Sequence, residues 1–178
     1  MVHIMEYKHY LRPSGKGIKL HLGCGDYWFE GYINIDINVY GGTDLIWDIK
    51  DKLPFQDHVV EVIEAYEVVE HFSKQEIDRM IEEWKRLLID GGRVRISVPD
   101  LEALSKQLDQ VSEENKKMII EDMYGMGGYQ THKWGYTKNT LEKLFADHLF
   151  THIQVVQGEL SERAGEPKLI LEAIYESR

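Results

Sequence analysis

Apolar and polar residues alternate along several short segments of the chain. Ile18–Leu22 and Tyr32–Ile37 show the pattern most clearly, the first running into a glycine and the second containing an acid at Asp36. A period of two residues is typical of a strand with one buried face. Further strands are predicted over residues 44–47, 93–98, 150–156 and 168–175, and over 59–66, where β-branched residues are frequent.

One segment changes to the helical period. From Ser73 to Leu88, apolar residues recur at spacings of three and four, which places them on one face of a helix. Ser73 and Glu76 form the sequence signature of a capping box at its start. Asp90-Gly91-Gly92 predicts its end, and further helices are expected within residues 101–123 and 140–148.

Strands that alternate with helices predict an α/β domain built on a mostly parallel, seven-stranded sheet. The last two strands are separated only by a polar loop, so we expect an antiparallel C-terminal hairpin at the sheet edge. The spacers after the first two strands are too short for full crossover helices, which predicts abbreviated first helices. We expect one domain over residues 1–178, with an N-terminal extension over 1–17 and a cap or lid within 101–136.

Composition narrows the class of protein. A chain of 178 residues with 43% hydrophobic and 29% charged residues is typical of one globular domain. No apolar run approaches the roughly 20 residues that a bilayer requires, so no membrane partner is expected. Cys24 is the only cysteine, which excludes an internal disulfide and makes a cytoplasmic location the default expectation. The net charge of −10 argues against a nucleic-acid partner.

A glycine turn follows the first predicted strand. Gly23 and Gly25 stand in the turn, and Asp36 ends the second strand. Ligands of open α/β sheets bind beyond the carboxyl ends of the strands, where glycines let the backbone approach the ligand closely. An acid at the end of the second strand accepts hydrogen bonds from ribose hydroxyls. The combination predicts a nucleoside ligand.

The same turn distinguishes between nucleoside ligands. A dinucleotide fingerprint would place a third glycine where this chain has Trp28. The short spacer also offers no helix N-terminus on which a pyrophosphate could bind. These features disfavour NAD and favour an adenosyl ligand without phosphates.

Several motifs together carry a family resemblance. They are His21–Asp26, Tyr32–Asp36, Asp48–Phe55, Glu67–Phe72, Leu87–Gly92 and Val98–Asp100, followed by Gly127–Tyr136 and Leu141–Phe150. In this order they resemble class I S-adenosylmethionine-dependent methyltransferases, and more narrowly the small methyltransferases of the type 11 group. The resemblance implies a Rossmann-like fold, S-adenosylmethionine as methyl donor and S-adenosylhomocysteine as product.

The resemblance also assigns cofactor contacts to positions of this sequence. Gly23 and Gly25 would pass under the methionyl part, with main-chain groups of Leu22 or Cys24 within reach of it. Asp36 would take the ribose hydroxyls, and Ile37 would lie against one face of the adenine. The remaining contacts would come from Asp48 at the adenine amine, the Ile49 amide at a ring nitrogen, and Glu67 at the methionyl end.

The sulfonium of the donor is already activated, so the chain mainly aligns an acceptor in line with the carbon–sulfur bond. Where the acceptor is a hydroxyl, a general base helps, and the candidate catalytic residues are His71, Glu67 and His132. The candidate acceptor-pocket residues are Asp100, Tyr129, His132 and Tyr136, with residues 125–136 expected as a lid. The resemblance implies a small-molecule or glycan-precursor acceptor.

The sequence leaves alternatives to a methyltransferase open. The chain could be a catalytically inactive module that binds S-adenosylmethionine or S-adenosylhomocysteine and regulates or scaffolds a partner. An NAD-dependent oxidoreductase is disfavoured by Trp28. Glu67, Glu70 and His71 match no compact metal motif, so no metal is expected.

Overall fold

The computed structural model describes residues 17–158 and 167–177, and of Tyr129 it describes the backbone alone. The expected N-terminal extension, apart from residue 17, lies outside the described residues. Residues 159–166 of the polar loop near the C-terminus also lie outside them.

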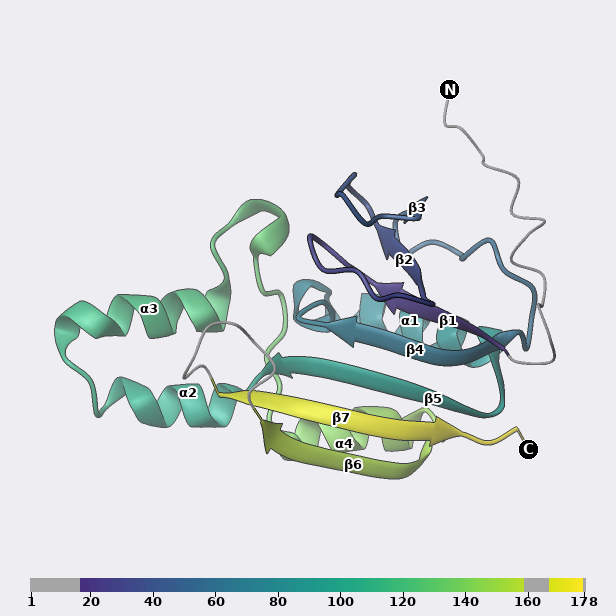
Figure 1. The fold of residues 1–178 in the computed structure, drawn as a ribbon. Coiled ribbons are helices and arrows are strands. Elements are labelled where there is room, and N and C mark those ends of the chain that lie inside the picture. Colours follow the sequence, from purple (N-terminus) through teal and green to yellow (C-terminus); the bar gives the residue numbers. More distant parts are fainter. Residues whose placement is uncertain (1–16, 159–166, 178) are drawn as a thin grey trace.

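Seven strands form one sheet in the order β3-β2-β1-β4-β5-β7-β6 (Figure 1). Their bounds are β1 Ile18–Leu22, β2 Ile33–Asp36, β3 Leu45–Ile46, β4 Val60–Tyr66, β5 Leu88–Pro99, β6 Thr151–Gly158 and β7 Lys168–Tyr175. Pairing is parallel from β3 through β5, and antiparallel between β5 and β7 and between β7 and β6. The predicted mostly parallel sheet with an antiparallel C-terminal hairpin is confirmed.

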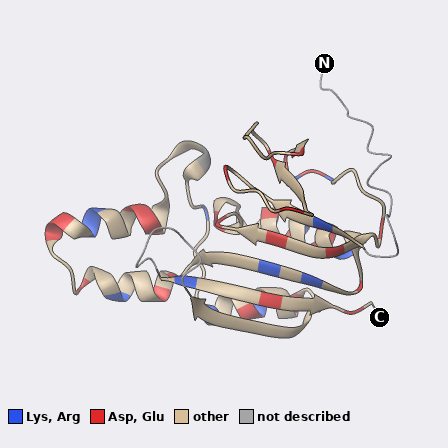
Figure 2. Cartoon of the chain, viewed as in Figure 1, with Lys and Arg blue, Asp and Glu red and all other residues tan. Residues whose placement is uncertain are grey.

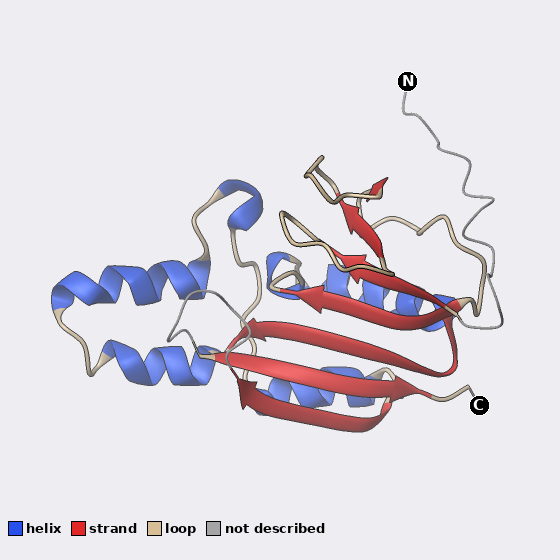
Figure 3. Cartoon of the chain, in the orientation of Figure 1, coloured by secondary structure: helices blue, strands red, loops and turns tan. Residues whose placement is uncertain are grey.

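The helices occupy two places around this sheet. Figure 3 shows α1 and α4 against one face of the sheet, whereas α2 and α3 extend beyond the carboxyl ends of the parallel strands. The bounds are α1 Lys74–Leu87, α2 Leu101–Leu108, α3 Glu113–Tyr124 and α4 Lys138–Asp147, with short 3₁₀ turns η2 Val69–His71 and η3 Gly128–Gln130. None of the helices in the described residues is long and apolar enough to cross a membrane.

The main core lies between the sheet and the two helices α1 and α4. Ile63 of β4 and Ile96 of β5 point to this side, as alternation along the strands requires, and both are fully buried. Trp84 of α1 and Phe145 of α4 meet them from the helix layer and are also fully buried. The apolar residues that recur along α1 therefore form the helix face that packs against the strands.

The opposite face of the sheet is polar and charged. Strand register places His21, Glu64, Arg95 and Glu172 in one row across β1, β4, β5 and β7. Arg95 and Glu172 form an ion pair with 3.0 Å between Nε and Oε1. Figure 2 shows these charged bands on the strands, and no helix of the described residues covers them.

A hydrogen-bond network takes the place of a helix between β1 and β2. The Asn34 carboxamide oxygen accepts from the Phe29 amide at 2.8 Å, and its amide nitrogen donates to Asp44 Oδ2 at 2.9 Å. The His21 ring stacks on Phe29 with 4.2 Å between ring centroids. These contacts fix the loop without a crossover helix, in agreement with the short spacer.

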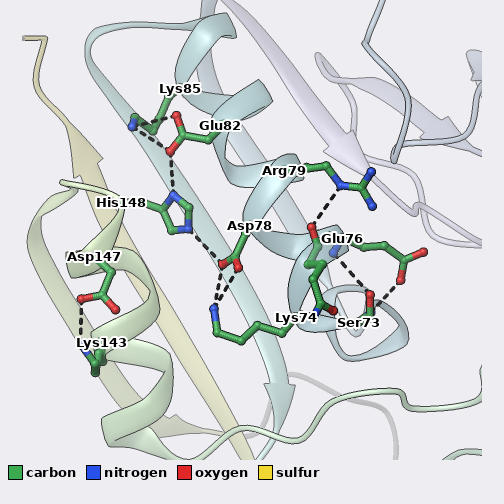
Figure 4. Close-up of polar contacts among 11 residues, drawn as sticks. Ser73, Lys74, Glu76, Asp78, Arg79, Glu82, Lys85, Lys143, Asp147 and His148 are labelled. Atoms are coloured by element: carbon green, nitrogen blue, oxygen red, sulfur yellow. Dashed lines mark hydrogen bonds and ion pairs between the residues drawn. The ribbon is translucent and has the colours of Figure 1, made fainter.

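The start of α1 is closed by a capping box. The Ser73 hydroxyl accepts from the Glu76 amide at 3.4 Å, and the Ser73 amide donates to the Glu76 carboxylate at 2.8 Å (Figure 4). The backbone hydrogen bond to Ser73 is the main cause that lowers the pKa of Glu76 to about 2. In the same close-up, His148 after α4 bridges Asp78 and Glu82 on α1 and so connects the two helices.

The boundary between α1 and β5 differs from the sequence prediction. The predicted strand begins at residue 93, whereas β5 begins at Leu88 and includes the two glycines at 91 and 92. Gly91 has a φ of 75°, and the pairing of β4 with β5 shifts register between Val60 and Val62. The glycine pair therefore lies in an irregular part of the strand. Glycine is common at such irregularities as well as at helix ends, because each can require a backbone conformation that other residues rarely adopt.

Replacement of the cap gives a direct test of this start of α1. Ser73→Ala should lower the free energy of unfolding by about 1 kcal/mol, because it leaves an amide of the first turn without its acceptor. Ser112→Ala is the matched control, because Ser112 precedes α3 without a side-chain cap bond. Urea denaturation measures both variants, and equal losses in the two would contradict the capping role of Ser73.

Candidate functional site

The turn after β1 requires glycine for steric reasons. Gly23 has a φ of 65°, and a Cβ atom there would lie 2.5 Å from Cγ2 of Val68. Gly25 has a φ of 52°, with open space where a side chain would stand. The bare backbone thus passes close to the segment after β4 on one side and is accessible from the other, as a ligand lying against it would need.

Asp36 holds this turn from the end of β2. Its Oδ2 accepts from the Gly25 amide at 3.0 Å, and its Oδ1 accepts from the Asn38 amide at 2.9 Å. A carboxylate offers about four acceptor positions, so each oxygen can take one further donor. The side chain therefore positions the glycine turn and still has acceptors for a pair of hydroxyls.

A cavity of about 350 Å³ opens beside Asp36. Ile37, Trp47 and Ile49 supply apolar surface to it, and Asp48 supplies a carboxylate. Asp48 Oδ1 accepts from the Lys50 amide at 3.0 Å, and its Oδ2 lies 3.2 Å from Lys50 Nζ. Apolar walls with a few placed polar groups are typical of small-molecule sites, and this set fits an adenosyl group.

A second, wider cavity of about 1120 Å³ lies on the other side of Gly23 and shares Gly23, Tyr40, Glu67 and Gln130 with the first. Glu67 stands between the two and adopts a φ of 55°, which is uncommon for a residue with a side chain. Its Oε1 accepts from the Ser97 hydroxyl at 2.8 Å, and its Oε2 pairs with Lys168 Nζ. The pair is partly shielded from water, because the Lys168 side chain is 3% exposed.

Two histidines meet next to these cavities. The rings of His71 and His132 lie 4.9 Å apart between centroids, in an edge-to-face arrangement. Burial lowers the pKa of His71, which favours its neutral form. His71 lines the cavity of about 350 Å³, and His132 lines a third, smaller cavity together with Glu70 and Tyr136.

The other candidate acceptor residues are placed differently. Asp100 is buried, caps α2 through the amides of Glu102 and Ala103, and lines a separate cavity. Tyr136 is 2% exposed, and its hydroxyl has no hydrogen-bond partner among the described residues. The backbone of Tyr129 lies in η3, but its side chain lies outside the described part of the structure. Neither Asp100 nor Tyr136 lines the two cavities beside Gly23.

Two further predicted cofactor residues, Leu22 and Cys24 in the glycine turn, are buried in the protein. Leu22 is fully buried at the end of β1, so only its main chain is available to a ligand. Cys24 is also buried, with its Sγ 3.8 Å from Thr43 Oγ1, and burial raises the pKa of its thiol. Cys24 therefore acts as a small packing residue of the turn.

Sequence reasoning missed Lys168, Ser97 and Trp47. Lys168 and Ser97 reach Glu67 from β7 and β5, and Trp47 lines the cavity beside Asp36. The one available signal for Lys168 was a lysine at the start of an otherwise apolar C-terminal strand. Strand order, which brings β7 beside β5, is what places it at the site.

Comparisons with known proteins bear on this site. A family model described as a methyltransferase domain matches residues 43–96. The fold is similar to a SAM-dependent methyltransferase from Archaeoglobus fulgidus, with a TM-score of 0.67, 15% identity and coverage of 95% of this chain and 90% of that chain. A SAM-dependent methyltransferase from Methanosarcina mazei gives a TM-score of 0.66 at 18% identity, covering 99% and 100% of the two chains. No curated protein matches the sequence.

A third similar structure contains ligands. It is the 1,6-didemethyltoxoflavin-N1-methyltransferase of Burkholderia thailandensis with bound 1,6-didemethyltoxoflavin and S-adenosylhomocysteine, at a TM-score of 0.62 and 15% identity over 96% of this chain and 75% of that chain. The family match covers residues 43–96, and the fold is shared with all three of these methyltransferases.

The pair of Glu67 and Lys168 provides a test of the site's electrostatics. Lys168→Met should lower the free energy of unfolding by about 1–3 kcal/mol, because it leaves a partly buried carboxylate without its cation. In the double variant Lys168→Met/Glu67→Gln, the loss should be smaller than the sum of the two single losses.

The control for this cycle is Lys106→Met, which removes the exposed ion pair with Glu102 on α2. That change should alter the free energy of unfolding by less than about 1 kcal/mol. Additive losses in the cycle at Glu67 and Lys168, measured by urea denaturation, would show that the two side chains do not stabilise each other.

Proposed function

We propose that this chain is a class I S-adenosylmethionine-dependent methyltransferase of the type 11 group, and that it transfers the methyl group to a small molecule or a glycan precursor by in-line displacement. The observation that carries the proposal is the geometry of Asp36, which holds Gly25 and keeps acceptors for two hydroxyls at the mouth of a cavity. The neighbour from Burkholderia thailandensis, which has 1,6-didemethyltoxoflavin bound, supports a small-molecule acceptor.

The residues around the turn have separate tasks in cofactor binding. Asp36 accepts from the ribose, and Ile37 packs against the adenine. The Asp48 carboxylate and the Ile49 amide recognise the polar edge of that base. Main-chain groups of residues 22–25 meet the methionyl part, which also approaches Glu67. These assignments agree with the shared lining of the two cavities at Gly23 and Glu67.

When bound, the sulfonium supplies an already activated methyl group. The chain contributes by holding the acceptor lone pair in line with the carbon–sulfur bond and by excluding water. Acceptance of a proton from a hydroxyl acceptor falls to Glu67, His71 or His132, all of which lie at or beside the cavities. The presence of these groups at the cavity supports an enzyme over a binding module without activity.

The ribose contact can be measured directly by calorimetric titration with S-adenosylhomocysteine. Asp36→Ala should weaken binding about 100-fold, because two hydrogen bonds to a charged acceptor are lost. Asp36→Asn, which still accepts from the Gly25 amide but has no charge, should show an intermediate loss. Thermal unfolding without ligand checks that each variant is folded.

Asp109→Ala is the matched control, because Asp109 is exposed at the end of α2. It should bind S-adenosylhomocysteine as the unaltered chain does. Binding of NAD in place of S-adenosylhomocysteine, or unchanged affinity in folded Asp36→Ala, would contradict the proposal.

A further inference from the structure

Three side chains with metal-binding donors converge beside the cavity of about 350 Å³, which His71 lines. Glu70 and His71 come from η2, directly after β4, and His132 comes from the segment after η3. One donor atom from each lies within 4.8 Å of the others. Glu70 is 1% exposed, whereas the two histidines are half-buried. The sequence expectation of no metal considers Glu67, Glu70 and His71 alone, because His132 is distant in the chain.

The backbone holds His132 at this place. The amides of Lys133 and Trp134 both donate to the Glu70 carbonyl, at 2.8 and 3.2 Å, and the His132 amide donates to the Tyr124 carbonyl at 2.9 Å. Gly125 allows residues 130–132 to lie this close to the end of α3, since a Cβ atom at Gly125 would lie 1.7 Å from the Gln130 carbonyl oxygen. The convergence therefore follows from the main chain and does not depend on a chance contact of flexible side chains.

The hydrogen bonding of His71 suits a metal ligand. Its Nδ1–H donates to the Thr131 carbonyl at 3.2 Å, so the neutral ring carries its lone pair on Nε2. Histidines that bind metals almost always donate their other ring nitrogen to such an outer partner, which fixes the tautomer and the orientation of the ring. This bond is an observation independent of the cluster itself.

We propose that Glu70, His71 and His132 bind one divalent transition-metal cation of the zinc type. Two imidazoles and one carboxylate form a ligand set that zinc uses in catalytic sites, where a fourth position stays open for water or substrate. Imidazole donors favour zinc and its neighbours over magnesium or calcium, which prefer oxygen ligands. The open position would face the cavity of about 350 Å³, because His71 lines it.

This site also narrows the acceptor, a step that rests on the proposed function. A cation bound there would hold an acceptor oxygen and lower the pKa of that hydroxyl. The acceptor class would then be a compound with a hydroxyl group. The hydroxyl proton would pass to Glu67, the oxygen would form its bond to the methyl carbon as the carbon–sulfur bond breaks, and S-adenosylhomocysteine would leave. His71 and His132 then hold the cation, which leaves Glu67 as the carboxylate nearest the methionyl end.

The test uses the full chain without an affinity tag, freed of metals by dialysis against a chelator. Titration with zinc chloride should show one strong site per chain, and cobalt(II) chloride should give ligand-field absorption of a site with nitrogen ligands. His132→Asn and His71→Asn should each weaken zinc binding at least about tenfold. Glu70→Gln should do the same, with its folding checked by thermal unfolding.

His152→Asn is the matched control. His152 is 68% exposed on β6 and has a φ of 48°, a backbone conformation that asparagine tolerates. It should bind zinc as the unaltered chain does.

Absence of a stoichiometric site, or full binding in folded His71→Asn and His132→Asn, would overturn the proposal. Titration with S-adenosylhomocysteine in chelator distinguishes this failure from failure of the proposed function, because cofactor binding through Asp36 needs no cation.

Discussion

The hydrogen bond from the Gly25 amide to the Asp36 carboxylate, at 3.0 Å, is the constraint on which the site depends. The described segment between β1 and β2 has no helix to hold the turn, so the turn is fixed by its partners on β2. The Cys24 amide adds a second bond, donated to the Ile35 carbonyl at 3.1 Å. The Asp36 carboxylate both holds the turn and lines the cavity. One side chain therefore has a structural role and a proposed binding role.

Over the residues that the structure describes, helices cover only one face of the sheet, and this arrangement determines how the rest of the site is built. The core between the sheet and helices α1 and α4 fixes the strands, and the open face remains polar. The wider cavity extends over this polar face, where it is lined by Glu64, Arg95 and Lys168 as well as by the glycine turn. Lys168 reaches Glu67 because β7 runs antiparallel beside β5, so the C-terminal hairpin completes a site that begins at β1.

The sequence was sufficient for the features that depend on local pattern. Local sequence pattern predicted all seven strands, and the helical period with Ser73 and Glu76 predicted α1 with its capping box. The glycine turn and Asp36 were found because strand ends in parallel sheets are known ligand positions. Asp100 caps α2 and Tyr136 is buried, and local pattern could not place them relative to the two cavities beside Gly23, because their positions depend on how α2 and the later loop pack against the sheet.

Contacts between distant segments were not available from local pattern. Lys168 lies 101 positions from Glu67 in the sequence, and strand order alone brings the two together. The approach of His132 to His71 and Glu70 depends on backbone hydrogen bonds across the loop after α3. Such pairs need the fold before their chemistry can be recognised.

The most direct test of the account is a crystal structure of the chain with S-adenosylhomocysteine. The account predicts both ribose hydroxyls within hydrogen-bond distance of Asp36, the adenine between Ile37 and Asp48, and the sulfur near Glu67. A nucleoside bound away from the turn at residues 23–25, or a ribose without contact to Asp36, would contradict it.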